Sequence, residues 1–390
     1  MNADTASLLE MRKFVAPEFV FGAGVIELAG QYAINYNARK ILLVTDPGVK
    51  RAGLTGTVEQ SLKKAGIPYV VFDCVTPNPK DYEVMEGVQV YRQEQCDVIV
   101  AVGGGSPMDC AKGIGISSTN AMHVLTFEGV DQVPVPGPPL IFIPTTAGTA
   151  ADISQFDIIT DTVRKVKIAI VSKLVIPDVS LLDPCTTITM DQHLTAATGM
   201  DALTHAVEAY VSNASSPVTD LFALDAIRLI RKHLLDAVEQ PTNMAARESM
   251  MLASLFAGLA FSNASLGMVH AMAHSLGGLL DLPHGECNAI LLEHVVEFNF
   301  NAAAQRYVDV ARALGLNPEA LAGGGEKSNL VQAISDMRES AGIRPRLREL
   351  NLQREDIPAL AENAFNDPCL ATNPRVASVK DIRECYERAY

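Results

Sequence analysis

The first half of the chain contains short, uninterrupted apolar runs that alternate with helical stretches. These runs span residues 40–46, 68–73, 97–106, 139–145 and 178–183. A strand without polar alternation has no solvent-facing side, so such runs are typical of parallel strands that are buried on both faces. The spacing therefore predicts an α/β unit, a doubly wound parallel sheet with helices on both faces. Residues 156–172 predict an additional hairpin with its turn near Asp161 and Thr162.

The pattern changes after Pro184. From Thr189 onward helical periodicity dominates and β-branched runs fade. We therefore expect an N-terminal Rossmann-like α/β domain over residues 1–187 and a C-terminal all-helical domain over residues 188–390. Ligands usually bind at domain interfaces and at the carboxyl ends of parallel strands, so the active site is expected in the interdomain cleft.

Residues 249–280 contain no Asp, Glu, Lys or Arg. The segment is long enough to suggest a transmembrane helix, but serine, asparagine, glycine and two histidines interrupt it. A pair of helices buried at the centre of the helical domain fits this composition better.

The overall charge excludes some partners. The formal net charge is −14, whereas nucleic acid and anionic membranes both recruit clustered Lys and Arg. The N-terminus lacks the basic and apolar regions of a signal peptide. The seven cysteines form no CxxC pair, which disfavours a zinc-thiolate site and a disulfide framework. These features indicate a cytoplasmic protein with reduced thiols, bound to neither nucleic acid nor membrane.

Three polar loops follow predicted strands. The glycines of "VGGGSPMDCAK" (102–112) let the backbone approach a ligand at a helix N-terminus, although the loop is neither a P-loop nor GxGxxG and could be a simple tight turn. Asp46 ends another strand, where a carboxylate can accept from a ribose 2′-OH and would favour NAD over NADP; a helix N-cap is the alternative. "PTTAGTAAD" (144–152) can donate to a pyrophosphate or simply turn the chain. Together the loops favour one extended, nucleotide-like ligand.

Histidines and one aspartate suggest a metal site in the second half. Asp201 and His205 are four residues apart on a predicted helix, and His270 and His274 repeat this spacing before His284. For Asp201 and His205 alone, a carboxylate–histidine hydrogen bond is the simpler interpretation. Together, ligands of this kind suit Fe(II), Zn(II), Mn or Ni. Periodicity does not decide which of His270 and His274 would be a spectator.

With these stretches in view, the chain resembles the iron-containing (group III) alcohol dehydrogenases. The matching motifs are "GGGSPMDCAK", "PTTAGT", "GMDALTHAVEAY", "GLAFSNASLGMVHAMAH" and "PHGECNAILL", in the family's order, followed by "NPR" at 373–375. The resemblance implies metal ligands at Asp201, His205, His270 and His284, with His274 in the pocket. It also implies a set of cofactor-binding residues. These are Asp46, Asn78, Gly104, Gly105, Ser106, Asp109, Thr145, Thr146, Thr149 and Lys167.

The chain departs from the family pattern at three positions. Ser275 stands where proline is common, which we expect to loosen a turn beside His274. Asp152 replaces the usual glutamate, and Phe156 occupies a position near the nicotinamide where relatives often carry a small polar residue. Phe156 makes the pocket less polar, so the identity of the substrate is not carried over.

The resemblance implies an NAD-linked, metal-dependent alcohol dehydrogenase. We expect it to interconvert a small primary alcohol or diol and its aldehyde by hydride transfer, with Fe2+ or another divalent ion such as Zn2+. His274 would either relay a proton or shape the pocket. A homodimer or larger homo-oligomer is expected, with residues 13–24 as the first candidate for the contact. The alternatives are a zinc-dependent polyol dehydrogenase of the same fold and a non-catalytic metal- or nucleotide-binding protein.

Overall fold

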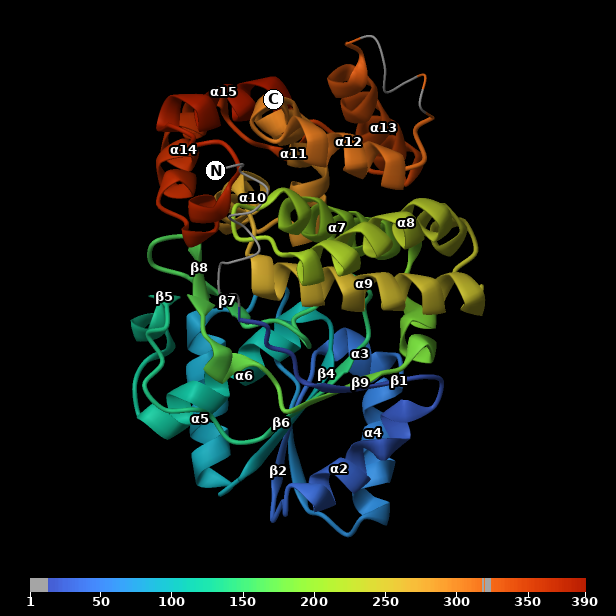
Figure 1. Cartoon of the computed structure of the whole chain (residues 1–390). Helices are drawn as coiled ribbons and strands as arrows, with labels where there is room; N and C mark the ends of the chain where they lie inside the picture. Colours follow the sequence, from blue (N-terminus) through green and yellow to red (C-terminus); the bar gives the residue numbers. More distant parts are fainter. Residues whose placement is uncertain (1–12, 318, 320–323) are drawn as a thin grey trace.

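The first half of the chain forms a six-stranded parallel sheet in the order β1-β9-β6-β4-β2-β3 (Figure 1). The computed structural model describes residues 13–317, 319 and 324–390. The strands of this sheet are β1 (Glu18–Phe21), β2 (Ile41–Val44), β3 (Tyr69–Phe72), β4 (Val98–Gly103), β6 (Leu140–Pro144) and β9 (Val179–Leu182). The prediction of a parallel sheet from uninterrupted apolar runs is confirmed.

Alternate residues of the central strands enter two different cores. In β2, Ile41 and Leu43 pack with α2 (Ala29–Asn35), α3 (Pro47–Arg51) and α4 (Leu54–Lys64). Leu42 and Val44 belong to the core on the opposite face, which α5 (Asp81–Gln93) and α6 (Gly105–Asn120) cover. Both faces are therefore dry, which explains why the strand sequences show no polar alternation.

A second, three-stranded sheet with the order β5-β8-β7 lies beside the first. The predicted hairpin is present as β7 (Phe156–Asp161) and β8 (Val166–Val171), and β5 (Gly129–Val130) pairs with β8. The sequence did not predict β5 or β1. Glu18–Phe21 lies inside residues 13–24, the segment predicted to contribute to a homo-oligomer contact, and it pairs in parallel with β9 at the edge of the large sheet.

The chain is helical after β9, which confirms the predicted second part of the fold. A 3₁₀ segment, Pro184–Thr189, leads into the helices. They are α7 (Gln192–Val211), α8 (Pro217–Glu239), α9 (Met244–Ala264), α10 (Met268–Leu280), α11 (His284–Asn299), α12 (Ala304–Ala313), α13 (Glu326–Ser340), α14 (Ile357–Phe365) and α15 (Val379–Ala389). In Figure 1 these helices form one body above the sheet, and α9 lies nearest to it.

The uncharged segment 249–280 forms most of α9 and all of α10. Within the described part of the chain, α9 alone is long and apolar enough to cross a membrane, but most of it is buried inside the protein. It packs against α7 and α8 in the core of the helical half. Gly258 lets α9 approach the loop that follows β6, since a Cβ there would lie 2.6 Å from the Ala150 side chain. The lack of charge therefore reflects burial in this core.

Candidate active site

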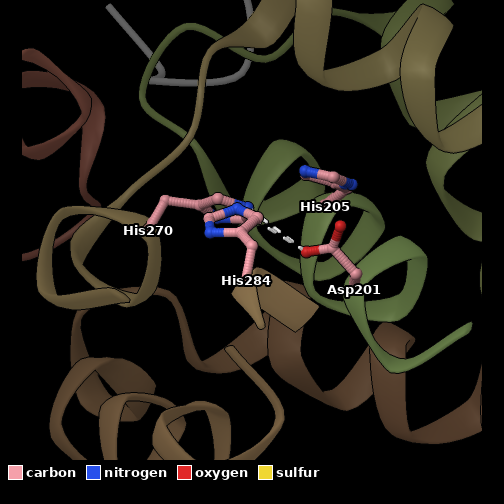
Figure 2. Close-up of side chains that lie close together, drawn as sticks. All are labelled: Asp201, His205, His270 and His284. Carbon is pink, nitrogen blue, oxygen red and sulfur yellow. Dashed lines mark ion pairs between the residues drawn. The ribbon is translucent and has the colours of Figure 1, made fainter. Parts of the chain in front are cut away.

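Asp201, His205, His270 and His284 converge from three helices. Asp201 and His205 lie one turn apart on α7, His270 lies on α10, and His284 is the first residue of α11 (Figure 2). One potential ligand atom from each lies within 4.8 Å of the others. Asp201 Oδ1 is 3.9 Å from His270 Nε2 and 3.8 Å from His284 Nε2. Four residues spread over more than eighty positions thus share one small volume.

Two glycines bring these segments together. At Gly285, beside His284, a Cβ would lie only 2.2 Å from the Ala197 carbonyl oxygen, so α11 touches α7 more closely than any side chain allows. Gly148, after β6, is equally confined, with the Thr198 carbonyl oxygen 2.3 Å from a would-be Cβ. The sheet and both helices therefore meet backbone to backbone around the cluster.

Asp201, His205 and His270 are buried, His284 is partly exposed, and low pKa values keep the imidazoles neutral. Desolvation lowers the pKa of His205 to about 4 and that of His270 to about 3, and it also holds the pKa of His284 well below its usual value. Neutral imidazoles keep a lone pair free for a ligand. Asp201 is 1% exposed, and a buried carboxylate needs a compensating charge.

Buried polar atoms without partners mark the same place. Of the buried side-chain atoms without a hydrogen-bond partner among the described residues, Asp201 Oδ2, His284 Nδ1 and Asn288 Oδ1 lie in this cluster, and the others belong to Ser117, Ser118 and Asp157. Orphaned atoms of this kind are rare in folded proteins and require an explanation. One carboxylate and three neutral imidazoles, without thiolate, fit a divalent transition-metal ion.

Hydrogen-bond partners outside the cluster fix the orientation of two of the imidazoles. His270 Nδ1 lies 2.5 Å from Glu208 Oε2, and His205 Nδ1 lies 3.2 Å from the Gly148 carbonyl oxygen. Glu208 is held in turn by the Val269 backbone N–H at 2.7 Å, and burial raises its pKa to about 7. Because Nδ1 is engaged in both rings, Nε2 is the nitrogen available to a metal ion, as in carboxylate–histidine–metal arrangements. Sequence reasoning missed Glu208, although it stands one turn after His205 on the same helix.

His274 lies beside the cluster but outside it. Its Nδ1 lies 2.8 Å from Asp367 Oδ2, and its ring stacks on that of His284 with centroids 5.3 Å apart. Although burial disfavours the charged form, His274 and backbone donors lower the pKa of Asp367. The structure thereby distinguishes His270, which lies in the cluster, from His274, which lies outside it; the periodicity of the sequence could not make this distinction. Asp367, which holds His274, was not predicted, because nothing in the sequence links it to a residue 93 positions earlier.

One cavity of about 700 Å³ contains the whole predicted site. It runs from the end of β2 to the first turn of α11, between the sheet and the helical half. All of the predicted residues line it: Asp46, Asn78, Gly104, Gly105, Ser106, Asp109, Thr145, Thr146, Thr149, Phe156, Lys167, Asp201, His205, His270, His274 and His284.

The glycine turn and the threonine loop meet at the carboxyl ends of β4 and β6. A Cβ on Gly104 would lie 3.2 Å from Thr146, and one on Gly105 would lie 3.2 Å from Thr149. Glycine here leaves the two loops in contact and opens the N-terminus of α6 to the cavity. Free backbone N–H groups at a helix N-terminus favour an anionic group such as a pyrophosphate.

Asp46 fits both interpretations made from the sequence. Its Oδ1 accepts from the backbone N–H of Gly48 at 2.7 Å and of Val49 at 2.9 Å, so it caps α3. It also lines the cavity at the end of β2. Capping and ligand binding are therefore compatible at this position.

Lys167 and Asn78 connect the hairpin to the helical half. Lys167 Nζ donates to Asn78 Oδ1 at 2.7 Å, and Asn78 Nδ2 donates to Asp281 Oδ1 at 2.7 Å. Burial lowers the pKa of Lys167. Because Asp281 immediately precedes the segment that carries His284, this chain of hydrogen bonds ties the two ends of the cavity together.

A buried pair lies under the glycine turn. Lys112 Nζ donates to the Phe156 carbonyl oxygen at 2.6 Å and lies 3.9 Å from Asp109 Oδ1. Burial lowers the pKa of Lys112 and raises that of Asp109 to about 7. Asp152, one of the departures, is buried nearby, and desolvation raises its pKa to about 6.

Aromatic side chains wall the cavity next to the cluster. The Phe156 ring lies 5.6 Å from that of Phe261, and Phe261 stacks on His205 at 4.2 Å. The expectation for Ser275 was wrong, since no turn exists beside His274. Helix α10 runs unbroken to Leu280, and Ser275 Oγ donates to the Leu360 carbonyl oxygen at 3.0 Å.

Two family models match the chain. The model described as iron-containing alcohol dehydrogenase matches residues 16–184, and that of the C-terminal part of the Fe-containing alcohol dehydrogenase family matches residues 195–390.

Curated relatives and solved structures agree with these matches. The chain is 45% identical over 373 residues to a 1,3-propanediol dehydrogenase of Citrobacter freundii, covering 95% of this chain and 96% of that protein. It is 39% identical over 376 residues to an NAD-dependent methanol dehydrogenase of Bacillus methanolicus, covering 96% and 99%. A solved 1,3-propanediol oxidoreductase superposes with a TM-score of 0.94 at 43% identity, covering 98% of this chain and all of that one. An alcohol dehydrogenase from Oenococcus oeni also gives a TM-score of 0.94, at 39% identity, covering 97% of this chain and all of that one.

Proposed function

Because this chain belongs to the iron-containing alcohol dehydrogenase family, we propose that it uses NAD and a divalent metal ion to interconvert a small primary alcohol or diol with its aldehyde. The single observation that carries this proposal is the cavity in which a glycine turn at a helix N-terminus and a carboxylate–imidazole cluster share one space. An oxidoreductase needs both in one place, because the hydride donor and acceptor must be in contact.

We assign the metal to Asp201, His205, His270 and His284, with Fe2+ as the ion and Zn2+ as the alternative. When bound, the ion would supply a Lewis acid, and NAD would supply the hydride acceptor. The chain supplies the remaining requirements. Glu208 and the Gly148 carbonyl oxygen hold two imidazoles with Nε2 toward the cluster.

Along the nucleotide, we assign the pyrophosphate to Gly104, Gly105 and Ser106, flanked by Asp109 and the threonines at 145, 146 and 149. Asp46 would contact the adenosine end. Lys167 would contact the nicotinamide ribose, and Asn78, which is hydrogen-bonded to Lys167 at 2.7 Å, would contact a neighbouring part of the nucleotide. The carboxylate of Asp46 is expected to repel a 2′-phosphate and thereby to favour NAD over NADP.

At the reacting end, Phe156 and Phe261 exclude water from the alcohol carbon. A dry site strengthens the electrostatic interactions on which alcohol activation depends. Alcohol oxidation transfers a hydride to the cofactor and releases the hydroxyl proton. We assign His274 to that proton, since its Nδ1 is engaged by Asp367 and the residue lines the cavity.

The apolar wall favours a small alcohol or diol over a sugar phosphate. No arginine that could bind a phosphate lies near Phe156 in the cavity lining, whose one arginine, Arg51, follows Asp46 at the other end. A polyol dehydrogenase of the same fold is the second candidate, and intact ligand and glycine-turn residues argue against a non-catalytic protein.

We propose a cytoplasmic homodimer or larger homo-oligomer. All seven cysteines are free, as in a reducing compartment. β1 is an edge strand, and Phe14 and Phe19 beside and within it are exposed, which makes this edge a candidate contact. Light scattering of the purified protein tests the oligomeric state.

The function is tested on anaerobically purified protein by metal analysis and by NADH formation from a panel of short alcohols and diols. We expect metal near one equivalent per chain and NAD-linked turnover. Asp201→Ala should lose metal and turnover while NAD still binds. Normal turnover by that variant would contradict the assignment of the metal site.

A further inference from the structure

Asn288 lies at the centre of the proposed metal ligands. It stands one turn after His284 on α11, and its side chain is fully buried. Its amide Nδ2 is 2.6 Å from Asp201 Oδ1, 3.1 Å from His270 Nε2 and 3.1 Å from His284 Nε2. One amide nitrogen therefore contacts ligand atoms from all three helices that build the cluster.

This arrangement leaves hydrogen-bonding groups unmatched. An amide NH2 carries two hydrogens, so it cannot donate to three acceptors at once. The other end of the amide, Asn288 Oδ1, is buried without a partner among the described residues. Asp201 Oδ2 and His284 Nδ1 are likewise buried without a partner, so three such atoms lie together in this cluster.

A second asparagine on the same helix shows what a structural role looks like. Asn299 Nδ2 donates to Asn373 Oδ1 at 2.8 Å, and Asn299 Oδ1 accepts from Asn373 Nδ2 at 2.9 Å. Both ends of that buried amide are satisfied. Asn288, in contrast, makes its side-chain hydrogen bonds only with the proposed ligands.

The NH2 group of Asn288 occupies the electrostatic role of a cation. It points its partial positive charge at one carboxylate oxygen and two imidazole lone pairs, the atoms that a divalent ion would use. The same group cannot keep this direction when an ion is present, because both would be positive. A half-turn of the amide exchanges nitrogen and oxygen and presents the unpaired Oδ1 instead.

We propose that Asn288 is a fifth side chain of the metal centre. In the metal-free protein its NH2 holds Asp201, His270 and His284 together, and with a divalent ion bound its Oδ1 faces the ion. This inference rests on the proposed function, since it takes the metal ligands as assigned there. It adds a neutral oxygen donor to the set and makes Asn288 a determinant of metal affinity.

The test measures metal binding directly, without turnover. Metal-free wild type, Asn288→Ala and Asn299→Ala are titrated with Co2+ against a competing chelator, and the visible absorption of the bound cobalt is recorded. We expect Asn288→Ala to bind Co2+ at least about tenfold more weakly, with a changed cobalt spectrum, because a donor is lost. Asn299→Ala should melt at a lower temperature but keep the wild-type affinity and spectrum.

Asn288→Asp provides a second variant of the same shape. It keeps an oxygen at the ion but cannot donate to the ligands, so the metal-free variant should melt below wild type. With Co2+ it should bind about tenfold more tightly than wild type or better, and it should recover its melting temperature.

The outcomes separate this inference from the proposed function. Wild-type affinity and spectrum in Asn288→Ala, or unchanged or weaker binding in Asn288→Asp, would overturn the role of Asn288 while leaving the metal site in place. If Asp201→Ala binds Co2+ like wild type, the metal site itself fails.

Discussion

The Nδ1 of His274 lies 2.8 Å from Oδ2 of Asp367, a hydrogen bond between residues 93 positions apart. It joins α10 to the loop before the last helix of the chain. Asp367 Oδ1 also accepts from the Cys369 backbone N–H at 2.8 Å, so the carboxylate is fixed from both sides. The direction of the His274 ring is thus set by a residue that does not line the cavity.

We expect Asp367→Asn to lower kcat by roughly tenfold or more while metal content and cofactor affinity stay unchanged. The amide keeps an oxygen for Cys369 but presents NH2 to His274. His274 must then accept through Nδ1 and carry its proton on Nε2, the wrong tautomer for taking a proton from the alcohol. The measurement is kcat against pH with metal-loaded enzyme. An unchanged profile would mean that His274 only shapes the pocket.

Asp46 both caps α3 and lines the cavity, and two variants separate these roles. Asp46→Ser keeps a side chain that caps α3, whereas Asp46→Ala does not, so only the alanine variant should lose about 1 kcal/mol of unfolding free energy. Both remove the carboxylate, and both should raise kcat/KM with NADP relative to NAD by about tenfold. Unfolding curves and steady-state rates with the two cofactors check this. Unaltered cofactor preference in both variants would leave Asp46 with capping alone.

Gly285→Ala is expected to open the metal cluster. A Cβ at this position would meet the Ala197 carbonyl oxygen, so α11 must move away from α7 and carry His284 with it. We expect a loss of about 1–3 kcal/mol of unfolding free energy and weaker metal binding. Gly56→Ala on α4 is the control, because nothing lies within 4 Å of its added Cβ. It should be neutral or stabilising, with metal affinity intact.

Glu208 predicts a pH dependence of the metal-free protein. Burial raises its pKa from 4.5 to about 7 in the folded state. Between these two pKa values the folded chain holds a proton on Glu208 that the unfolded chain has lost. The stability that the protonated Glu208 contributes is therefore complete below the unfolded pKa, and it is lost as pH rises toward 7. The Glu208→Gln variant has no titratable group at this position, so it lacks this pH dependence.

Unfolding by denaturant at about pH 5 and about pH 8 checks this. Relative to wild type, Glu208→Gln should become more stable by up to about 3 kcal/mol at the higher pH. If the free energies of unfolding of wild type and Glu208→Gln differ by the same amount at both pH values, the raised pKa of Glu208 is contradicted.

Much of the fold follows from local pattern. The uninterrupted apolar runs predicted the central strands because burial on both faces leaves a signature in each strand by itself. β1 left none. Glu18–Phe21 is a four-residue edge strand with partly exposed side chains, and its only partner, β9, lies about 160 residues later in the chain. Such a strand forms because it pairs with a distant strand, and the local sequence pattern does not indicate that pairing.

The same distinction applies to the site. Asp201 and His205 are visible because they stand four residues apart on a predicted helix. His270 is visible because it stands in a segment without charged residues, and His284 follows just after that segment. Glu208, Asn288 and Asp367 could not be found in this way. Their importance lies in contacts between helices, which exist only after the chain has folded. Ser275 was misjudged for the same reason, since its hydroxyl finds an acceptor on α14 that the sequence does not show.

The positions of the cluster residues along the chain have a consequence for biosynthesis. The residues assigned to the nucleotide end by Lys167, whereas the cluster is incomplete until His284 has been added and His274 is unsupported until Asp367 has. A nascent or truncated chain that stops before His284 carries scattered carboxylates and imidazoles but cannot gather them around an ion. At the site proposed above, a metal ion would therefore meet its full set of ligands only late in synthesis, after His284 has been added.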